Sequence, residues 1–118
     1  MSKATNSSLT SSLAVTLALA LVIGFLTLTP ISDAGVPGSD KIHHFLAFFA
    51  LTLPLAFARP RLALWIVLAA MAYGGAIELI QPFVGRSKDI FDFLADGVGS
   101  ISAAAVGMGL AWLRYRVA

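Results

Sequence analysis

Four long hydrophobic runs dominate the pattern of the chain, and short polar segments separate them. The first run, about residues 13–29, carries no charge and ends before Pro30. The other three extend over about residues 41–58, 62–81 and 90–113. Each run approaches the roughly 20 residues that a helix needs to cross a membrane. The pattern therefore predicts an all-α membrane protein with four transmembrane helices in a compact bundle.

The composition agrees with this pattern. Of the 118 residues, 58% are hydrophobic and 12% are charged, and the mean hydropathy is +0.89. A soluble domain carries about a quarter charged residues. We expect one transmembrane domain over residues 13–113, a disordered tail over residues 1–12 and a short tail over residues 114–118. The absence of cysteine excludes disulfides and thiolate nucleophiles.

The basic residues predict how the bundle is oriented. If there are four spans, one side of the membrane holds five basic residues and no acidic residue: Lys3, Arg59, Arg61, Arg114 and Arg116. The other side holds Lys41, Arg86 and Lys88 together with all six acidic residues. Because cytoplasmic loops carry an excess of Lys and Arg, we expect both termini in the cytoplasm. Cleavage after Ala34, at an A-x-A-like site, would leave three spans in the same orientation.

Ionisable residues lie inside three of the runs, near the acidic side. His44, Glu78 and Asp96 each lie four residues from a polar or proline position that marks a helix end, which is about 6 Å of helix. Lipid offers no partner to such side chains, so they should point into the bundle and toward one another, and each is a functional-site hypothesis. The predicted cluster contains Asp40, Lys41, His44, Glu78, Gln81, Arg86, Asp92 and Asp96.

Some of these residues also have purely structural interpretations. Glu78 and Gln81 are three residues apart on one helix face, so they could form an interhelical hydrogen-bonding pair instead of facing a ligand. Arg86 can hold an anionic group through its planar guanidinium. It can equally pair with Asp89 or Asp92, and we favour this internal pairing.

Helix packing is predicted for one face of the last run. Gly99, Ala103 and Gly107 follow one another at four-residue intervals. Small residues at this spacing let helix backbones approach closely in lipid. The same stripe carries Asp92 and Asp96 nearer the acidic side, so the acidic groups should lie on the face that packs inward.

We expect neither a metal nor another cofactor. Imidazole and carboxylate groups suit zinc or manganese, and His44, Glu78, Asp92 and Asp96 are the suitable donors. However, no pair of them has the compact H-x-x-x-H or H-E-x-x-H spacing of a specific metal motif. The sequence also lacks a Gly-rich phosphate loop, a nucleophile elbow and a nucleic-acid motif. Nucleic acid is therefore not an expected partner.

A series of short motifs follows the chain from the second run to the fourth. They are Asp40, Lys41, His44 and Phe45, then Tyr73-Gly74, Glu78 and Gln81, Gly85-Arg86, and Asp92, Asp96 and Gly99. With these motifs the sequence resembles the VanZ-like family of small bacterial membrane proteins, whose first-described members were associated with teicoplanin resistance and whose pattern is D-K-x-x-H-F, Y-G, E-x-x-Q, G-R and D-x-x-x-N-x-x-G. Asp96 stands where the family usually has Asn. The resemblance covers roughly residues 40–107 and implies four helices, a multi-pass location in the bacterial cytoplasmic membrane and an extracytoplasmic polar pocket.

Three functions are compatible with this site. The favoured one is binding of a cell-envelope component, such as a lipid headgroup or a lipid-linked precursor, with a phosphate near Arg86 and Lys41. It would link the chain to envelope homeostasis or glycopeptide resistance. The second is an intramembrane hydrolase or transferase acting on a lipid carrier, with Glu78 or Asp92 as general base and His44 as acid–base group. The third is a structural accessory subunit with other membrane proteins as partners.

Overall fold

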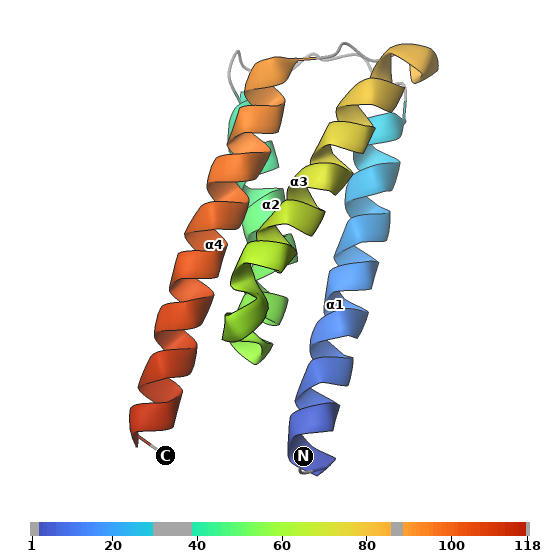
Figure 1. Ribbon diagram of the computed structural model, residues 1–118. Helices are drawn as coiled ribbons and strands as arrows, with labels where there is room; N and C mark the ends of the chain where they lie inside the picture. The colour runs from blue at the N-terminus through green and yellow to red at the C-terminus, as the bar shows by residue number, and fades with distance from the viewer. Residues whose placement is uncertain (1–2, 30–38, 86–88, 118) are drawn as a thin grey trace.

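The helix α2 contacts each of the other three helices, and its interface with α4 is the most extensive in the molecule. In the computed structural model the chain runs through α1 (Lys3–Leu28), α2 (Ser39–Ala58), the 3-10 turn η1 (Pro60–Leu62), α3 (Ala63–Ile80), the 3-10 turn η2 (Gln81–Val84) and α4 (Ile90–Val117) (Figure 1). The structure describes residues 3–29, 39–85 and 89–117, with the side chains of residues 8–29, 41–85 and 89–114.

The predicted fold class is confirmed. Within the described ranges there is no strand, and four helices are long and apolar enough to cross a membrane. The candidate spans are Ser8–Leu28, Lys41–Ala58, Pro60–Val84 and Ile90–Arg114. The helices form a bundle of 48 × 22 × 21 Å. The chain is therefore a multi-pass membrane protein.

The start of α1 differs from the prediction. Residues 1–12 were expected to be a disordered tail, but α1 begins at Lys3 and continues without a break into the first span. Ser, Thr and Asn cost only up to about 0.7 kcal/mol each relative to Ala inside a helix. Once the apolar run has nucleated the helix, each added residue gains a backbone hydrogen bond, so the helix extends through the polar segment.

The two ends of the bundle differ in polarity. The start of α1 and the end of α4 lie at one end, as four spans require (Figure 1). At the opposite end α2 and α4 begin and α3 gives way to η2. We call this second end the polar end, because it carries Lys41, Asp89 and Asp92. That it faces outward from the cytoplasm stays a prediction from the basic residues.

Small residues allow α4 to lie directly against α2. A Cβ atom on Gly99 would overlap the carbonyl oxygen of Phe45, and one on Gly107 would lie 2.8 Å from Cβ of Ala56. Ala103, between these glycines, is fully buried. The Thr52 hydroxyl donates to the Ser100 hydroxyl at 3.1 Å within the same interface. The stripe predicted for helix packing therefore lies on the side of α4 that faces α2.

Helix α1 is attached by apolar packing, with Ile23 in a core cluster with Phe48 and Leu51, and by hydrogen bonds to backbone carbonyls. The Thr16 hydroxyl donates to the carbonyl of Leu51 on α2 at 3.3 Å. The Tyr73 hydroxyl on α3 donates to the carbonyl of Ala20. Large hydrophobic side chains such as Leu17, Leu21 and Phe25 are exposed on the outer face of α1. In a membrane this surface is covered by lipid, so an exposed apolar helix face is the expected state of α1.

Replacing Gly99 by Leu should remove the close approach of α2 and α4. The added side chain would overlap the Phe45 backbone, which cannot move without shifting α2, so we expect the free energy of unfolding to fall by about 3 kcal/mol or more. Unfolding of the purified protein in mixed detergent micelles measures this change.

Gly109→Leu is the matched control, because a Cβ atom at that position would meet no other element among the described residues within 4 Å. It should leave the unfolding midpoint almost unchanged. Equal tolerance of both substitutions would contradict the packing of α4 against α2.

Candidate functional site

His44 and Asp96 form the buried centre of the polar end. His44 lies one turn into α2 and Asp96 lies more than one turn into α4. Nδ1 of His44 is 2.7 Å from Oδ1 of Asp96, a hydrogen-bonding distance. His44 is 8% exposed and Asp96 is 1% exposed. The contact therefore joins two helices where neither group can reach bulk water.

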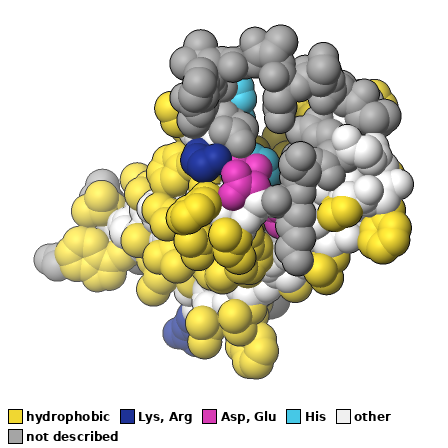
Figure 2. All heavy atoms as spheres, turned by 90° about the horizontal axis from the view of Figure 1, so that it is seen from above, with side chains coloured by type: hydrophobic (Ala, Val, Ile, Leu, Met, Phe, Trp, Pro, Cys, Tyr) yellow, Lys and Arg dark blue, Asp and Glu magenta, His cyan; other side chains and the backbone are white. Residues whose placement is uncertain are grey.

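Three further charged groups, Asp92, Lys41 and Asp89, extend this contact toward the membrane surface. Nε2 of His44 lies 3.6 Å from Oδ2 of Asp92. The ammonium group of Lys41 lies 3.4 Å from Oδ1 of Asp92 and 3.1 Å from Oδ2 of Asp89. Figure 2 looks onto this end and shows basic and acidic side chains side by side, with hydrophobic side chains around them. The polar groups thus form a connected network from the surface to the buried pair.

Glu78 joins the network from the end of α3. Its Oε2 accepts a hydrogen bond of 2.9 Å from the backbone N–H of Asp89. Glu78 is 4% exposed, and Oε1 has no hydrogen-bond partner among the described residues. One donor atom each from His44, Glu78 and Asp96 lie within 4.8 Å of one another. We call the set Lys41, His44, Glu78, Asp89, Asp92 and Asp96 the polar cluster.

Gly74 provides the space for the Asp96 carboxylate. A Cβ atom at this position on α3 would lie 2.7 Å from Oδ2 of Asp96 and 3.2 Å from the ring of Phe48. This Oδ2 is buried and has no hydrogen-bond partner in the described part of the chain. Glycine therefore lets α3 approach closely enough for Glu78 to reach the His44–Asp96 pair.

Comparison with protein families assigns the chain. The sequence model of the VanZ/LLP1 family matches residues 3–114, which cover all four helices. The chain belongs to the VanZ/LLP1 family. Searches among curated proteins and among solved structures found no match. The suspected resemblance to VanZ-like proteins is thereby confirmed.

In this VanZ/LLP1 chain, several of the motif positions from separate helices meet at the polar cluster. Lys41 and His44 come from α2, Gly74 and Glu78 from α3, and Asp96 from α4. These residues are up to 55 positions apart in sequence, the difference between 41 and 96. The fold thus brings together in space short motifs that lie far apart in the sequence.

Three predicted members of the cluster have a different or undescribed position. Gln81 belongs to η2 and is 2% exposed, and its side-chain amide donates to the carbonyl of Thr27 on α1 at 3.1 Å. Its described contact is therefore with α1, at the point where α3 ends at Ile80 and η2 begins. Asp40 lies in the first turn of α2, but its side chain is outside the described residues, as is the whole of Arg86.

Asp89, which the sequence suggested only as a charged partner within the acidic segment, has two roles in the cluster. Its backbone N–H binds Glu78, and its carboxylate contacts Lys41. Its Oδ1 also accepts a hydrogen bond of 2.9 Å from the backbone N–H of Phe91, which caps α4. An Asp directly before an apolar helical run is a recognised N-cap signal. That signal identifies the cap, but the backbone contact with Glu78 depends on tertiary structure.

A groove between α3 and α4 begins at Glu78. It has a volume of about 460 Å³ and is lined by Ala72, Gly75, Ala76, Glu78, Leu79, Ile90 and Phe93. Apart from Glu78, this lining is apolar or backbone, and Leu79 and Ile90 are exposed at its rim. The groove therefore connects a buried carboxylate with the hydrophobic outer surface of the bundle.

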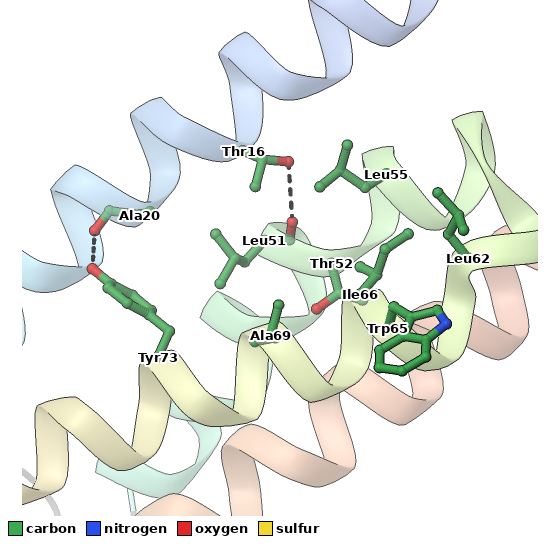
Figure 3. A pocket seen from close by; sticks show the side chains of 11 residues that line it. Thr16, Ala20, Leu51, Thr52, Leu55, Leu62, Trp65, Ile66, Ala69 and Tyr73 are labelled. Carbon is green, nitrogen blue, oxygen red and sulfur yellow. Dashed lines mark hydrogen bonds between the residues drawn. The ribbon is translucent and has the colours of Figure 1, made fainter.

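A second hollow lies among α1, α2 and α3, farther from the polar end (Figure 3). It has a volume of about 300 Å³, and its polar side chains are Thr16, Thr52 and Tyr73. The hydroxyls of Thr16 and Tyr73 are turned to backbone carbonyls of Leu51 and Ala20. No residue of the polar cluster lines this hollow, so it is separate from the candidate site.

Gly74→Ala should disturb the polar cluster directly. The new methyl group would press on buried Asp96 and Phe48, so we expect a loss of about 1–3 kcal/mol in the free energy of unfolding. Gly75→Ala is the control, since its methyl group would meet Phe93 at an ordinary 3.6 Å. Both substitutions gain the same helix propensity, so the difference between their unfolding midpoints isolates the contact with Asp96. Similar midpoints would contradict the described position of Asp96.

Proposed function

We propose that this chain binds the polar head of a membrane lipid or of a lipid-linked envelope precursor at the polar end of its bundle. The ligand's hydrocarbon chain would occupy the groove between α3 and α4, and its head would reach the polar cluster. We further propose that this end faces the extracytoplasmic side of the bacterial cytoplasmic membrane, because five basic residues flank the spans at the opposite end and three at this one.

The proposal rests on Glu78, because this one residue contributes to both the polar cluster and the groove. This residue belongs to the buried polar cluster and also lines the apolar groove. An amphipathic molecule needs such a connection, because its tail stays in hydrocarbon while its head requires polar partners. Ligand sites are typically apolar clefts with a few polar groups that fix orientation, and this groove has that character.

The charge of the site favours a head that carries hydrogen-bond donors or a counter-ion. The described cluster contains four carboxylates, Glu78, Asp89, Asp92 and Asp96, and one ammonium group, Lys41. Lys41 already contacts two of these carboxylates. Hydroxyl, amine and sugar groups suit this surrounding, and a phosphate would need a bound cation in addition to Lys41.

Binding explains the site better than the two alternatives do. Both ring nitrogens of His44 face carboxylates, which disfavours the acid–base role that an intramembrane hydrolase would give to this residue. A purely structural accessory subunit would not need buried carboxylate oxygens that lack a partner among the described residues, since neutral amides cost less to desolvate. If the ligand is a wall precursor, the binding would contribute to envelope homeostasis and to resistance against glycopeptides.

Lipid retained through purification tests the proposal. We expect the purified protein to carry a defined lipid, measured by mass spectrometry and by phosphorus per chain. Ala76→Leu places a larger side chain in the groove and should reduce retained lipid about tenfold, a change of about 1.4 kcal/mol. Glu78→Gln should also reduce it, because the amide keeps the shape but removes the charge.

Ala105→Leu is the matched control for the groove. It makes the same change in size at an exposed position of α4 that does not line the groove. Its lipid content should equal that of the wild type. If Ala76→Leu and Ala105→Leu retain the same lipid, or if Glu78→Gln folds and retains all of it, the proposed function is wrong.

A further inference from the structure

We propose that His44, Glu78 and Asp96 form a binding site for a divalent transition-metal ion, with zinc as the best match to the donors. The inference deepens the proposed function and rests on it for the identity of the further ligand, since the metal would contact the lipid head. The metal site itself follows from the geometry of three side chains.

The donor atoms lie at nearly the separation that a metal requires. One imidazole nitrogen and two carboxylate oxygens lie within 4.8 Å of one another. Zinc binds nitrogen and oxygen donors at about 2.0–2.2 Å, so two of its ligands are at most about 4.4 Å apart. An ion bound at Nδ1 of His44 would take the place of the hydrogen bond between Nδ1 and Oδ1 of Asp96, so small side-chain movements are needed to place the three donors around it. Such a mixed set of imidazole and carboxylate donors suits zinc.

Two buried carboxylate oxygens in this set have no hydrogen-bond partner among the described residues. They are Oε1 of Glu78 and Oδ2 of Asp96, in side chains that are 4% and 1% exposed. The other oxygen of each carboxylate is held, one by the backbone of Asp89 and one by His44. A buried charged oxygen without a partner costs several kcal/mol. A cation between the two carboxylates would compensate both.

The surroundings of His44 resemble the outer shell of a metal site. With Nδ1 on the side of Asp96, the opposite nitrogen Nε2 faces Oδ2 of Asp92 at 3.6 Å. A metal-binding histidine usually directs its second nitrogen to a carboxylate, which fixes the ring and raises its basicity. Asp92 is in turn held by Lys41 at 3.4 Å. Asp92 is therefore a positioning residue, and Lys41 orients it.

Sequence spacing alone argued against a metal, because the three donors lie on three helices. Their positions, 44, 78 and 96, do not form a compact motif. A three-donor site leaves a coordination position open for an exogenous ligand, as catalytic zinc sites do. A phosphate or hydroxyl oxygen of a lipid head could take that position. This explains how an acidic cluster could accept an anionic head.

Metal content and affinity test the inference on the full-length protein in detergent. Zinc per chain is measured after purification without chelators. The metal is then removed, and zinc alone is titrated against a competing chromophoric chelator. We expect about one zinc per chain. Glu78→Gln and Asp96→Asn should lower zinc affinity by more than the roughly 10–100-fold that loss of an outer-shell partner costs, and Asp92→Asn should fall within that range.

Asp89→Asn is the matched control. It removes one negative charge from the same cluster, keeps a capping side chain and leaves the backbone N–H that binds Glu78. Asp89 is partly exposed, so its charge should change zinc affinity by about fivefold or less. A loss in Asp89→Asn as large as that in Asp96→Asn would overturn the assignment of the donors.

Cobalt substitution gives a readout that does not depend on how the variants fold. Wild-type protein loaded with cobalt(II) should show the intense visible absorption of a four- or five-coordinate site. Weak absorption typical of a solvated octahedral ion, or zinc content equal to that of the Glu78→Gln/Asp96→Asn double variant, would overturn the inference.

Retained lipid is measured on the same samples. Lipid without zinc would refute only the metal site, and zinc without lipid would refute only the proposed function.

Discussion

The rest of the polar end depends on the contact between His44 and Asp96. An imidazole and a carboxylate buried beside hydrocarbon are each costly to desolvate unless they have a polar partner. At a distance of 2.7 Å, His44 and Asp96 are partners of each other. The contact also fixes how α2 and α4 lie against each other, which agrees with the close approach of Gly99 to Phe45. α3 then approaches through Gly74, and this places Glu78 beside the pair. The packing of α2, α3 and α4 and the burial of these ionisable side chains therefore depend on each other.

The depth of ionisable residues in the hydrophobic runs was the most informative feature of the sequence. It predicted that His44, Glu78 and Asp96 would share one region, because charged groups in lipid have no alternative to partners within the bundle. The small residues on α4 and the four spans followed from equally general physical reasons. Asp96 also gives this chain a carboxylate where the family pattern has an amide, so the proposed metal site belongs to this chain and not to the pattern.

Other features depend on tertiary geometry that no local pattern encodes. Gln81 lies three residues after Glu78, yet its amide contacts the Thr27 carbonyl, which depends on where α1 lies beside the start of η2. Asp89 reads as a helix cap in the sequence, while its backbone contact with Glu78 requires the folded hairpin of α3 and α4. The polar segment at the start of α1 was taken for a tail because composition does not reveal how far a nucleated helix extends.

A double-mutant cycle between His44 and Asp96 tests the central claim most directly. His44→Leu, Asp96→Leu and the double variant would be unfolded in mixed micelles with a chelator present, so that only the direct contact is measured. Because each single variant leaves an unpaired buried polar group, we expect the double variant to be more stable than the sum of the single effects predicts, with a coupling of about 0.5–3 kcal/mol. Additive effects, within about 0.5 kcal/mol, would contradict the claim that this pair organises the polar end.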